Sequence, residues 1–356
     1  MAQEKVFPNH ADVLLVTVTE VEGRAVLAEF ESQRSKGFIQ GDINPNQIYV
    51  SNKTYFDLGT IKGAKIFMVR SEMGAGGPAG SQATVTEAIQ ALSPSAVIML
   101  GISFGVDEQK QKIGDILVSR QLELYEHQRV GIDSAGELKI IPRGDRPSAS
   151  PRLLDRFGAS QLRWPESEAK VQFGLILSGH KLVDNQDYRE QLRSFAPEVI
   201  GGEMEGEGLY SAAHGAKVDW IVVKAICDWA DGKKYEKKAE RQKEAAKNAA
   251  RFVIHTLMQG GFTENSNMLQ KQPGRPISGK AKIEICDHVG DSWKKLADYF
   301  QIPPSEQAQF SKGDEARGIW AWLEYRKRLQ ELPEALGYID RQDLINVLDQ
   351  KPCRYE

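Results

Sequence analysis

Two short acidic stretches carry the residues best suited to chemistry. Glu203 and Glu205 form the first, with Met204 between them and a glycine on either side. Asp228 forms the second and directly follows the apolar run 221–226. A carboxylate at the carboxyl end of a buried parallel strand faces the crevice in which α/β proteins bind ligands. The two stretches together predict acid chemistry or electrostatic stabilisation on a ligand rich in hydroxyl groups.

Each of these acids also has a purely structural interpretation. Residues 209–213 follow the first stretch as a predicted helix, and the helix dipole favours carboxylates in a first helical turn. Asp228 alone is more typical of a helix cap or a turn than of a catalytic acid. Glu20 and Glu22 follow the first predicted strand, where we expect an exposed loop, and carboxylates in a loop are more often solvated than functional.

Two glycine turns follow predicted strands and are open to a ligand. Residues 74–80 are glycine-rich and precede a helix, which is the setting of a dinucleotide phosphate loop. Their pattern departs from Gly-x-Gly-x-x-Gly and lacks a Gly-Lys-Ser/Thr ending, so a P-loop is excluded and a dinucleotide-binding dehydrogenase is a weak alternative. The second turn starts at Gly101 and brings Ile102 and Ser103 to the sheet edge.

A lysine-rich run at 233–243 follows the second acidic stretch. Mixed charges at helical spacing usually form a solvated helix face. The alternative is contact with an anionic part of a ligand, because the run comes directly after Asp228 and Asp231.

The elements that must hold these residues alternate along residues 1–260. Helical patterns such as 84–92 separate apolar runs that we expect to be buried strands, at 13–18, 65–69, 96–100, 173–177 and 221–226. This alternation predicts an α/β fold with a largely parallel sheet. Residues 261–280 are polar and rich in glycine and proline, which is typical of a linker. From 281 to 356 the apolar periodicity is helical and predicts a small all-α bundle.

Bulk properties exclude several classes of protein. The chain has 356 residues, which favours two domains, and a net charge of -3, which argues against a nucleic-acid binder. Its three cysteines lie far apart without metal-ligand spacing, so we expect a reducing cytosol, no metal and no cofactor. No apolar stretch approaches the roughly 20 residues that span a bilayer, and no signal peptide is visible. We therefore expect a cytoplasmic protein without membrane contact.

Several of these features occur in a fixed order over about residues 10–258. The order is Glu22 after the first strand, the glycine turn at 101–105, Ser178-Gly179, Glu-Met-Glu-Gly at 203–206 and Cys-Asp-x-Ala-Asp at 227–231. This order resembles the nucleoside phosphorylase superfamily, and within it the methylthioadenosine/S-adenosylhomocysteine nucleosidases. The resemblance implies a phosphorylase-like three-layer α/β/α fold with a mixed central sheet.

The resemblance also implies a role for each acid. Asp228 matches the general acid that protonates N7 of a purine, so that the base leaves as a neutral species. Glu205 matches the acid that binds the ribose 2′ and 3′ hydroxyls, with Met204 packed on the sugar and Glu203 in support. Glu22 matches the carboxylate that orients and deprotonates the attacking water. The remaining implied substrate-binding positions are Gly101, Ile102, Ser103, Leu182, Val183 and Cys227.

Two departures from the superfamily bear on the reaction. The phosphorylases hold phosphate with an arginine before the glycine turn and a serine within it, and here these positions are Met99 and Ile102. A site without that cation and hydroxyl holds phosphate poorly, and Glu22 would repel it, so hydrolysis is favoured over phosphorolysis. Leu182 stands where the nucleosidases usually stack an aromatic side chain on the base, which leaves the base selectivity open.

The helical tail has a resemblance of its own. Trp293, Leu296 and Ala297 form a Trp-x-x-Leu-Ala pattern, which residues 321–325 and 339–345 continue. This pattern resembles death-fold domains, which associate homotypically, and it implies a partner protein with a similar domain. Bacterial effectors with such a tail resemble components of antiviral or programmed-death systems.

Together the two resemblances imply a purine nucleosidase that hydrolyses the N-glycosidic bond of an adenosine-type nucleoside or nucleotide. They also imply a homo-oligomer that is recruited through a death-like tail. A true phosphorylase and a nucleotide-sensing adaptor that binds without cleaving stay open as alternatives. The sequence does not decide between adenine and guanine, or between a thioether, a hydroxyl and phosphates on the 5′ carbon.

Overall fold

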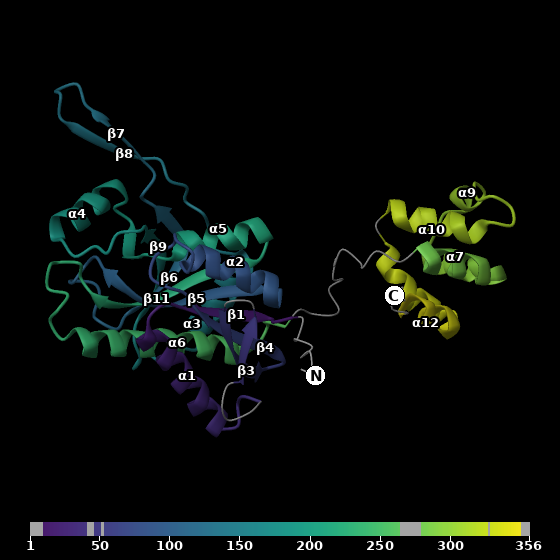
Figure 1. The fold of residues 1–356 in the computed structure, drawn as a ribbon, viewed down its shortest axis with the longest axis horizontal. Helices are drawn as coiled ribbons and strands as arrows, with labels where there is room; N and C mark the ends of the chain where they lie inside the picture. Colours follow the sequence, from purple (N-terminus) through teal and green to yellow (C-terminus); the bar gives the residue numbers. More distant parts are fainter. Residues whose placement is uncertain (1–9, 41–45, 51–52, 264–278, 327, 350–356) are drawn as a thin grey trace. The chain divides into compact units, whose positions relative to one another are not determined.

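The chain divides into two compact units, residues 1–264 and 265–356. The computed structural model describes residues 10–40, 46–50, 53–263, 279–326 and 328–349 (Figure 1). Residues 264–278, which make up most of the predicted linker 261–280, lie outside the described residues. Each unit has its own hydrophobic core.

The first unit is built on a mixed sheet. Its strands are β1 (Val13–Thr17), β2 (Asn46–Val50), β3 (Lys53–Ile61), β4 (Ala64–Arg70), β5 (Ala96–Gly105), β6 (Ile116–Leu124), β9 (Val171–Ser178), β10 (Val199–Glu203) and β11 (Asp219–Asp228). The strand order is β10-β9-β6-β11-β5-β1-β4-β3-β2. The five strands predicted from apolar runs are all present, and β1 pairs in parallel with both β4 and β5. The expectation of a largely parallel sheet was too simple, because β2, β3 and β4 pair antiparallel and β6 is antiparallel to β11.

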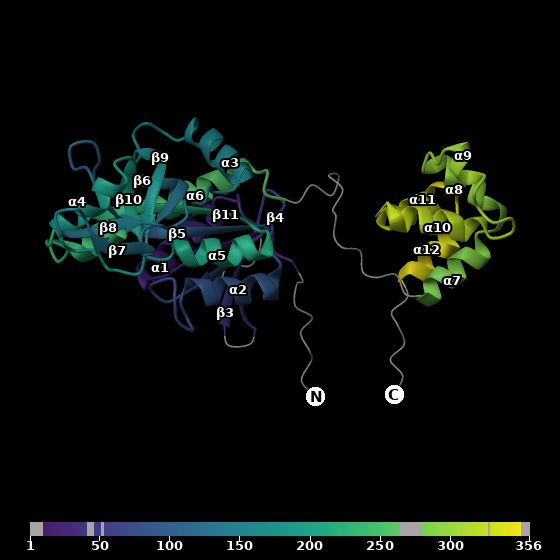
Figure 2. The same cartoon turned by 90° about the horizontal axis from the view of Figure 1, so that it is seen from above.

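Helices cover both faces of this sheet (Figures 1 and 2). They are α1 (Glu20–Ser35), α2 (Ser81–Leu92), α3 (Pro151–Gln161), α4 (Gln186–Phe195), α5 (Gly206–Ala216) and α6 (Lys238–Gln259). α2 packs with α5 on one face, and α1 packs with α6 on the other. All five residues of β1 are buried, as expected for a central strand that is covered on both sides. A hairpin of β7 (Gln128–Ile132) and β8 (Leu138–Pro142) projects from this body (Figure 1).

The sheet closes on itself at the edge where the acidic stretches lie. β10 pairs in parallel with β9 and antiparallel with β5, where Gly201 faces Gly105 and Gly202 faces Phe104. β5, β11, β6, β9 and β10 therefore form a closed ring of strands. A Cβ at Gly202 would clash with the Phe104 ring, and one at Gly201 would lie 2.6 Å from the Phe104 carbonyl oxygen. Glycine at these two positions thus allows the pairing that brings the ends of β5, β10 and β11 together.

The second unit is helical, as the periodicity predicts. It contains α7 (Gly279–His288), α8 (Trp293–Tyr299), α9 (Pro304–Gln307), α10 (Glu315–Tyr325), α11 (Leu332–Tyr338) and α12 (Gln342–Asp349), with short 3-10 turns at Gly290–Ser292 and Leu329–Glu331. Leu296, Ala297, Phe300 and Leu323 are buried in its core, whereas Trp293 is partly buried. Within the described residues, neither unit contains a helix that is both long and apolar enough to cross a membrane.

Candidate active site

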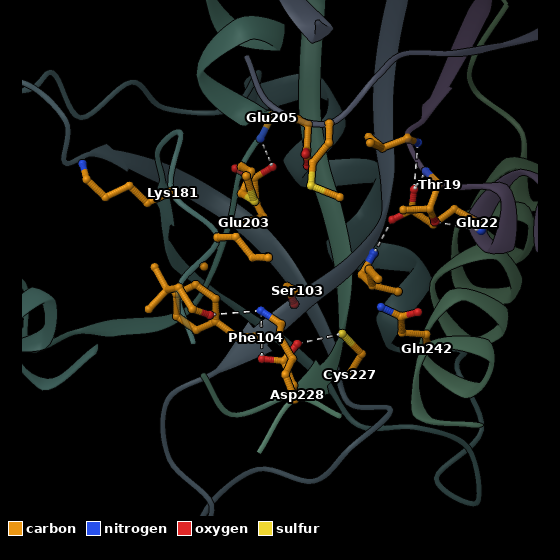
Figure 3. A pocket seen from close by; sticks show the side chains of 18 of the residues that line it. Thr19, Glu22, Ser103, Phe104, Lys181, Glu203, Glu205, Cys227, Asp228 and Gln242 are labelled. Carbon is orange, nitrogen blue, oxygen red and sulfur yellow. Dashed lines mark hydrogen bonds and ion pairs between the residues drawn. The ribbon is translucent and has the colours of Figure 1, made fainter. Parts of the chain in front are cut away.

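One cavity lies where β5, β10 and β11 end, between the first turn of α1 and the start of α6. Figure 3 shows Glu22, Glu205 and Asp228 approaching it from three sides, with Ser103 between them. Every site residue expected from the sequence lines this cavity except Gly101. Gly101 instead lies directly behind Glu22, where a Cβ would clash with the carboxylate. The structure therefore brings the two acidic stretches and the second glycine turn into a single site.

Glu22 is buried, with 2% of its surface exposed, and does not lie in the exposed loop that we expected. The Thr19 side chain caps α1, and Glu22 is the third residue of that helix, so the two form a capping box. Its Oε2 accepts the N–H of Val18 at 2.7 Å and of Thr19 at 2.8 Å, and its Oε1 accepts the N–H of Ile102 at 2.9 Å. Glu20, by contrast, is exposed and pairs with Arg24, so the solvated interpretation holds for that residue.

Glu203 ends β10 and supports the start of α5. Its Oε2 accepts the N–H of Glu205 at 2.9 Å, and its carboxylate also accepts the N–H of Gly206. Burial raises the pKa of Glu203, and the nearby charge of Lys224 opposes this shift. The structural interpretation, a carboxylate at the start of a helix, therefore holds for Glu203, because its carboxylate accepts backbone N–H groups at the N-terminus of α5.

Glu205 is held by three separate segments of the chain. Its Oε1 accepts the N–H of Gly74 at 3.0 Å, its Oε2 lies 3.1 Å from the Lys224 ammonium, and its carbonyl accepts the Ser81 hydroxyl at 2.7 Å. Gly74 has φ of 91°, a conformation that glycine adopts without strain. The glycine-rich loop at 74–80 therefore positions an acid of the cavity.

Lys224 is a charged residue of the site that the sequence interpretation missed. It lies within β11, is 0% exposed, and places its ammonium 3.1 Å from Glu205 and 3.8 Å from Glu203. Burial by itself would lower the pKa of Lys224, but the carboxylates of Glu205, Glu22 and Glu203 outweigh it and raise the pKa. The available signal was a single lysine inside the apolar run 221–226, because a buried charge requires a partner.

Asp228 stands at the end of β11, where the pairing register with β5 shifts between Ile226 and Asp228. Its Oδ1 accepts the N–H of Ala230 at 3.0 Å and lies 3.5 Å from the Lys234 ammonium. Its Oδ2 accepts the Cys227 thiol at 3.2 Å. Burial, and next the charge of Asp228, raise the pKa of Cys227, which keeps the thiol protonated as a donor. Ala230 has φ of 52°, so the turn that fixes Asp228 is a strained one.

Polar groups in the cavity remain open to a ligand. The Ser103 hydroxyl is buried and has no hydrogen-bond partner among the described residues. Lys234 and Lys238 line the cavity, so part of the run at 233–243 faces the site as well as solvent. Met73, Phe104 and Gln242 also line it, and the sequence interpretation did not include them.

Among the described residues, no group of three or more His, Cys, Asp or Glu side chains is placed to hold a metal ion.

Comparison with protein families assigns both parts of the chain. Residues 25–258 match the model of the Phosphorylase superfamily, and residues 279–351 match Bacterial Death-like domain 3. A death domain-containing ATP nucleosidase from Amphimedon queenslandica is 32% identical over 185 residues, which cover 48% of this chain and 34% of that protein. A 5′-methylthioadenosine/S-adenosylhomocysteine nucleosidase from Tolumonas auensis is 27% identical over 205 residues, 57% of this chain and 86% of that protein.

Solved structures share the fold of the first unit. The Neisseria meningitidis 5′-methylthioadenosine/S-adenosylhomocysteine nucleosidase, in complex with methylthio-immucillin-A, superposes with a TM-score of 0.54 at 19% identity, over 69% of this chain and 98% of that one. The futalosine hydrolase of Helicobacter pylori gives 0.56 at 20% identity, over 69% and 97%. The match to the family model over residues 25–258 is consistent with the ring of strands and with the acids at its edge. The chain therefore belongs to the phosphorylase superfamily, with a death-like domain at its C-terminal end.

Proposed function

We propose that this protein is a purine nucleosidase that hydrolyses the N-glycosidic bond of an adenosine-type nucleoside or nucleotide. The observation that carries the proposal is the convergence of Glu22, Glu205 and Asp228, each at most 4% exposed, on one cavity. The relatives named as nucleosidases support it, although the chain covers 34% of the length of the Amphimedon queenslandica protein.

The three acids suit the chemistry of breaking an N-ribosidic bond, in which Glu22 and Glu205 supply negative charge and Asp228 supplies a proton. The transition state resembles an oxocarbenium ion, which nearby negative charge stabilises. Glu205 would accept hydrogen bonds from the ribose hydroxyls, and Asp228, in its protonated form, would donate to N7 of the departing purine. Glu22 Oε1 accepts one N–H, from Ile102, and retains capacity for a hydrogen bond from the attacking water. The Ser103 hydroxyl is open to the same ligand.

Glu22 also favours water over phosphate as the nucleophile. Its carboxylate fills the space against Gly101 and takes the N–H of Ile102, a donor that a phosphate would otherwise use. Met99 is fully buried in β5 and brings no cation to this turn. A phosphate at this position would meet a carboxylate without a compensating positive charge, which disfavours phosphorolysis.

We further propose that residues 1–260 form the catalytic domain, 261–280 a linker and 281–356 a death-like adaptor. The match of residues 279–351 to a bacterial death-like domain supports a homotypic protein partner and a role as a recruited effector in antiviral or cell-death defence. A homo-oligomer and a cytoplasmic location, both expected from the sequence, stay predictions.

The test is base release by the purified full-length protein from adenosine, methylthioadenosine, guanosine and ATP, with and without phosphate. We expect free base and the corresponding free sugar without added phosphate, and a large loss of base release in Asp228→Asn and Glu205→Gln proteins that unfold at the wild-type temperature. Ribose 1-phosphate formed only with phosphate would identify a phosphorylase. Saturable nucleotide binding without base release would identify a sensing adaptor.

A further inference from the structure

The cavity is acidic at its floor and basic at its rim. The floor consists of Glu22, Glu203, Glu205 and Asp228, each at most 4% exposed. Lys234, Lys238 and Gln242 line the same cavity from the start of α6 and the turn before it, and we call them the α6 rim. Lys238 is exposed, whereas Lys234 and Gln242 are half-buried. Charge therefore changes sign between the bottom of the cavity and its opening.

Within the α6 rim, Lys238 is the cation available to a ligand. Lys234 donates to the Val183 carbonyl at 3.0 Å and lies 3.5 Å from Asp228. Lys181, elsewhere on the lining, pairs with Glu126. The Lys238 ammonium makes no hydrogen bond or ion pair with a side chain or carbonyl that the structure describes. Gln242, one helical turn further on, lies on the same face of α6. Figure 3 draws Gln242 between Glu22 and Asp228.

The stereochemistry of a nucleoside decides which part of the ligand meets this rim. In a β-nucleoside the base and the 5′ carbon lie on one face of the ribose, and the 2′ and 3′ hydroxyls lie on the other. With the hydroxyls at Glu205, the attacking water at Glu22 and the base at Asp228, the 5′ carbon lies on the Asp228 side. The α6 rim lies on that side of the cavity, because Lys234 is in contact with Asp228. This step rests on the function proposed above.

We propose that Lys238 and Gln242, with Lys234 beside them, form a subsite for a phosphate group on the 5′ carbon, so that the substrate is a purine nucleoside 5′-phosphate. An ammonium and a side-chain amide donate to phosphate oxygens, and the ammonium makes charge-assisted bonds. A neutral 5′ substituent would desolvate Lys238 without giving it a partner. The floor carboxylates repel phosphate, so the two ends of the cavity together orient a nucleotide.

A competing feature is Met73 on the lining, which is 56% exposed and suits an apolar 5′ thioether. The experiment therefore measures kcat/KM of the full-length protein for adenosine, methylthioadenosine, AMP, ADP and ATP. The test variant is Lys238→Gln. The matched control is Lys243→Gln, which makes the same change at an exposed position of α6 outside the cavity lining.

We expect the wild-type protein to cleave nucleotides more efficiently than adenosine or methylthioadenosine. The ratio of kcat/KM for ATP to that for adenosine falls about tenfold or more in Lys238→Gln, because one charge-assisted hydrogen bond is lost. Lys243→Gln keeps the wild-type ratio. Added salt lowers the wild-type ratio, since the rim is open to solvent.

Two results would overturn the subsite. One is a wild-type preference for methylthioadenosine or adenosine over every nucleotide, and the other is an equal change of the ratio in both variants. If no compound releases base, the proposed nucleosidase activity is wrong, and the subsite is tested separately by thermal unfolding with ATP or with adenosine. The subsite predicts that ATP raises the unfolding temperature of the wild type more than adenosine does, and that Lys238→Gln loses this difference. Equal increases with the two ligands in the wild type would refute the subsite.

Discussion

The ammonium of Lys224 lies 3.1 Å from the Glu205 carboxylate, in an ion pair almost sealed from solvent. A second carboxylate, that of Glu203, lies 3.8 Å from the same ammonium. Two acids at the edge of the cavity thus share one buried cation from the middle of β11. The ammonium gives both carboxylates a cationic partner, so that neither acid lies uncompensated inside the protein.

Replacing Lys224 with methionine is therefore expected to lower the free energy of unfolding by about 3–5 kcal/mol, because two carboxylates lose their buried partner. The carboxylates raise the pKa of Lys224 above its ordinary value of 10.5, so the stabilisation is complete below pH 10.5 and is lost only as the pH rises through the higher, folded-state pKa. Urea unfolding at neutral pH measures the loss. Lys243→Met, at an exposed position of α6, is the control, and equal midpoints for both variants would contradict the prediction.

Glu22→Gln is expected to reduce kcat for base release by about 10²- to 10⁴-fold, since a positioned base is lost. The helix cap is also weakened, by about 1 kcal/mol, so the unfolding temperature must be measured beside the rate. Glu20→Gln removes a carboxylate two residues away that pairs with Arg24, and it should leave both quantities near wild type. A Glu22→Gln protein with wild-type kcat would remove Glu22 from the mechanism.

Gly202→Ala is expected to destabilise the first unit by about 1–3 kcal/mol, because the new methyl group clashes with the Phe104 ring and strains the pairing of β10 with β5. Gly215→Ala is the matched control. Nothing lies within 4 Å of a Cβ at Gly215 in α5, so alanine there should raise stability by up to about 1 kcal/mol. Thermal unfolding compares the two, and the prediction fails if Gly202→Ala is as stable as the control.

His255 is expected to make stability fall in mild acid. Burial lowers the pKa of His255 from 6.5, with Arg163 adding to the effect. A histidine with a lowered pKa in the folded state stabilises above the unfolded value of 6.5, and this contribution is lost as the pH falls through the folded-state pKa. His255→Gln should flatten this part of the curve of unfolding free energy against pH. His127→Gln, at an exposed position, should keep it, and two identical curves would disprove the assignment.

The sequence allowed the strands and the acidic stretches to be predicted because both leave local signals. The apolar runs at 96–100 and 221–226 became β5 and β11, and Asp228 ends β11 as expected. Glu22 was misplaced in a loop although Thr19 and Glu22 carry the spacing of a capping box, and only two residues separate the end of β1 from the start of α1. That signal was present and was not used.

Other features depend on contacts between distant segments. Lys224 in β11 pairs with Glu205, which follows β10, and the N–H of Gly74 reaches Glu205 over 131 positions of sequence. The pairing of Gly202 with Phe104, which closes the ring of strands, joins segments that no apolar period connects. Contacts of this kind can be predicted only when the order of strands in the sheet is known. The residues that line the cavity were therefore predicted better than the residues that hold them in place.

The ring closure at Gly201 and Gly202 also bears on how the proposed nucleosidase could change its substrate. Each of β5, β10 and β11 pairs with a neighbouring strand on both sides. A substitution within these strands is therefore expected to affect the stability of the fold as well as ligand binding. Leu182 and Lys238 line the cavity from outside those strands. New specificities are therefore expected to arise at these two peripheral segments, while the acids at the ring edge keep one reaction.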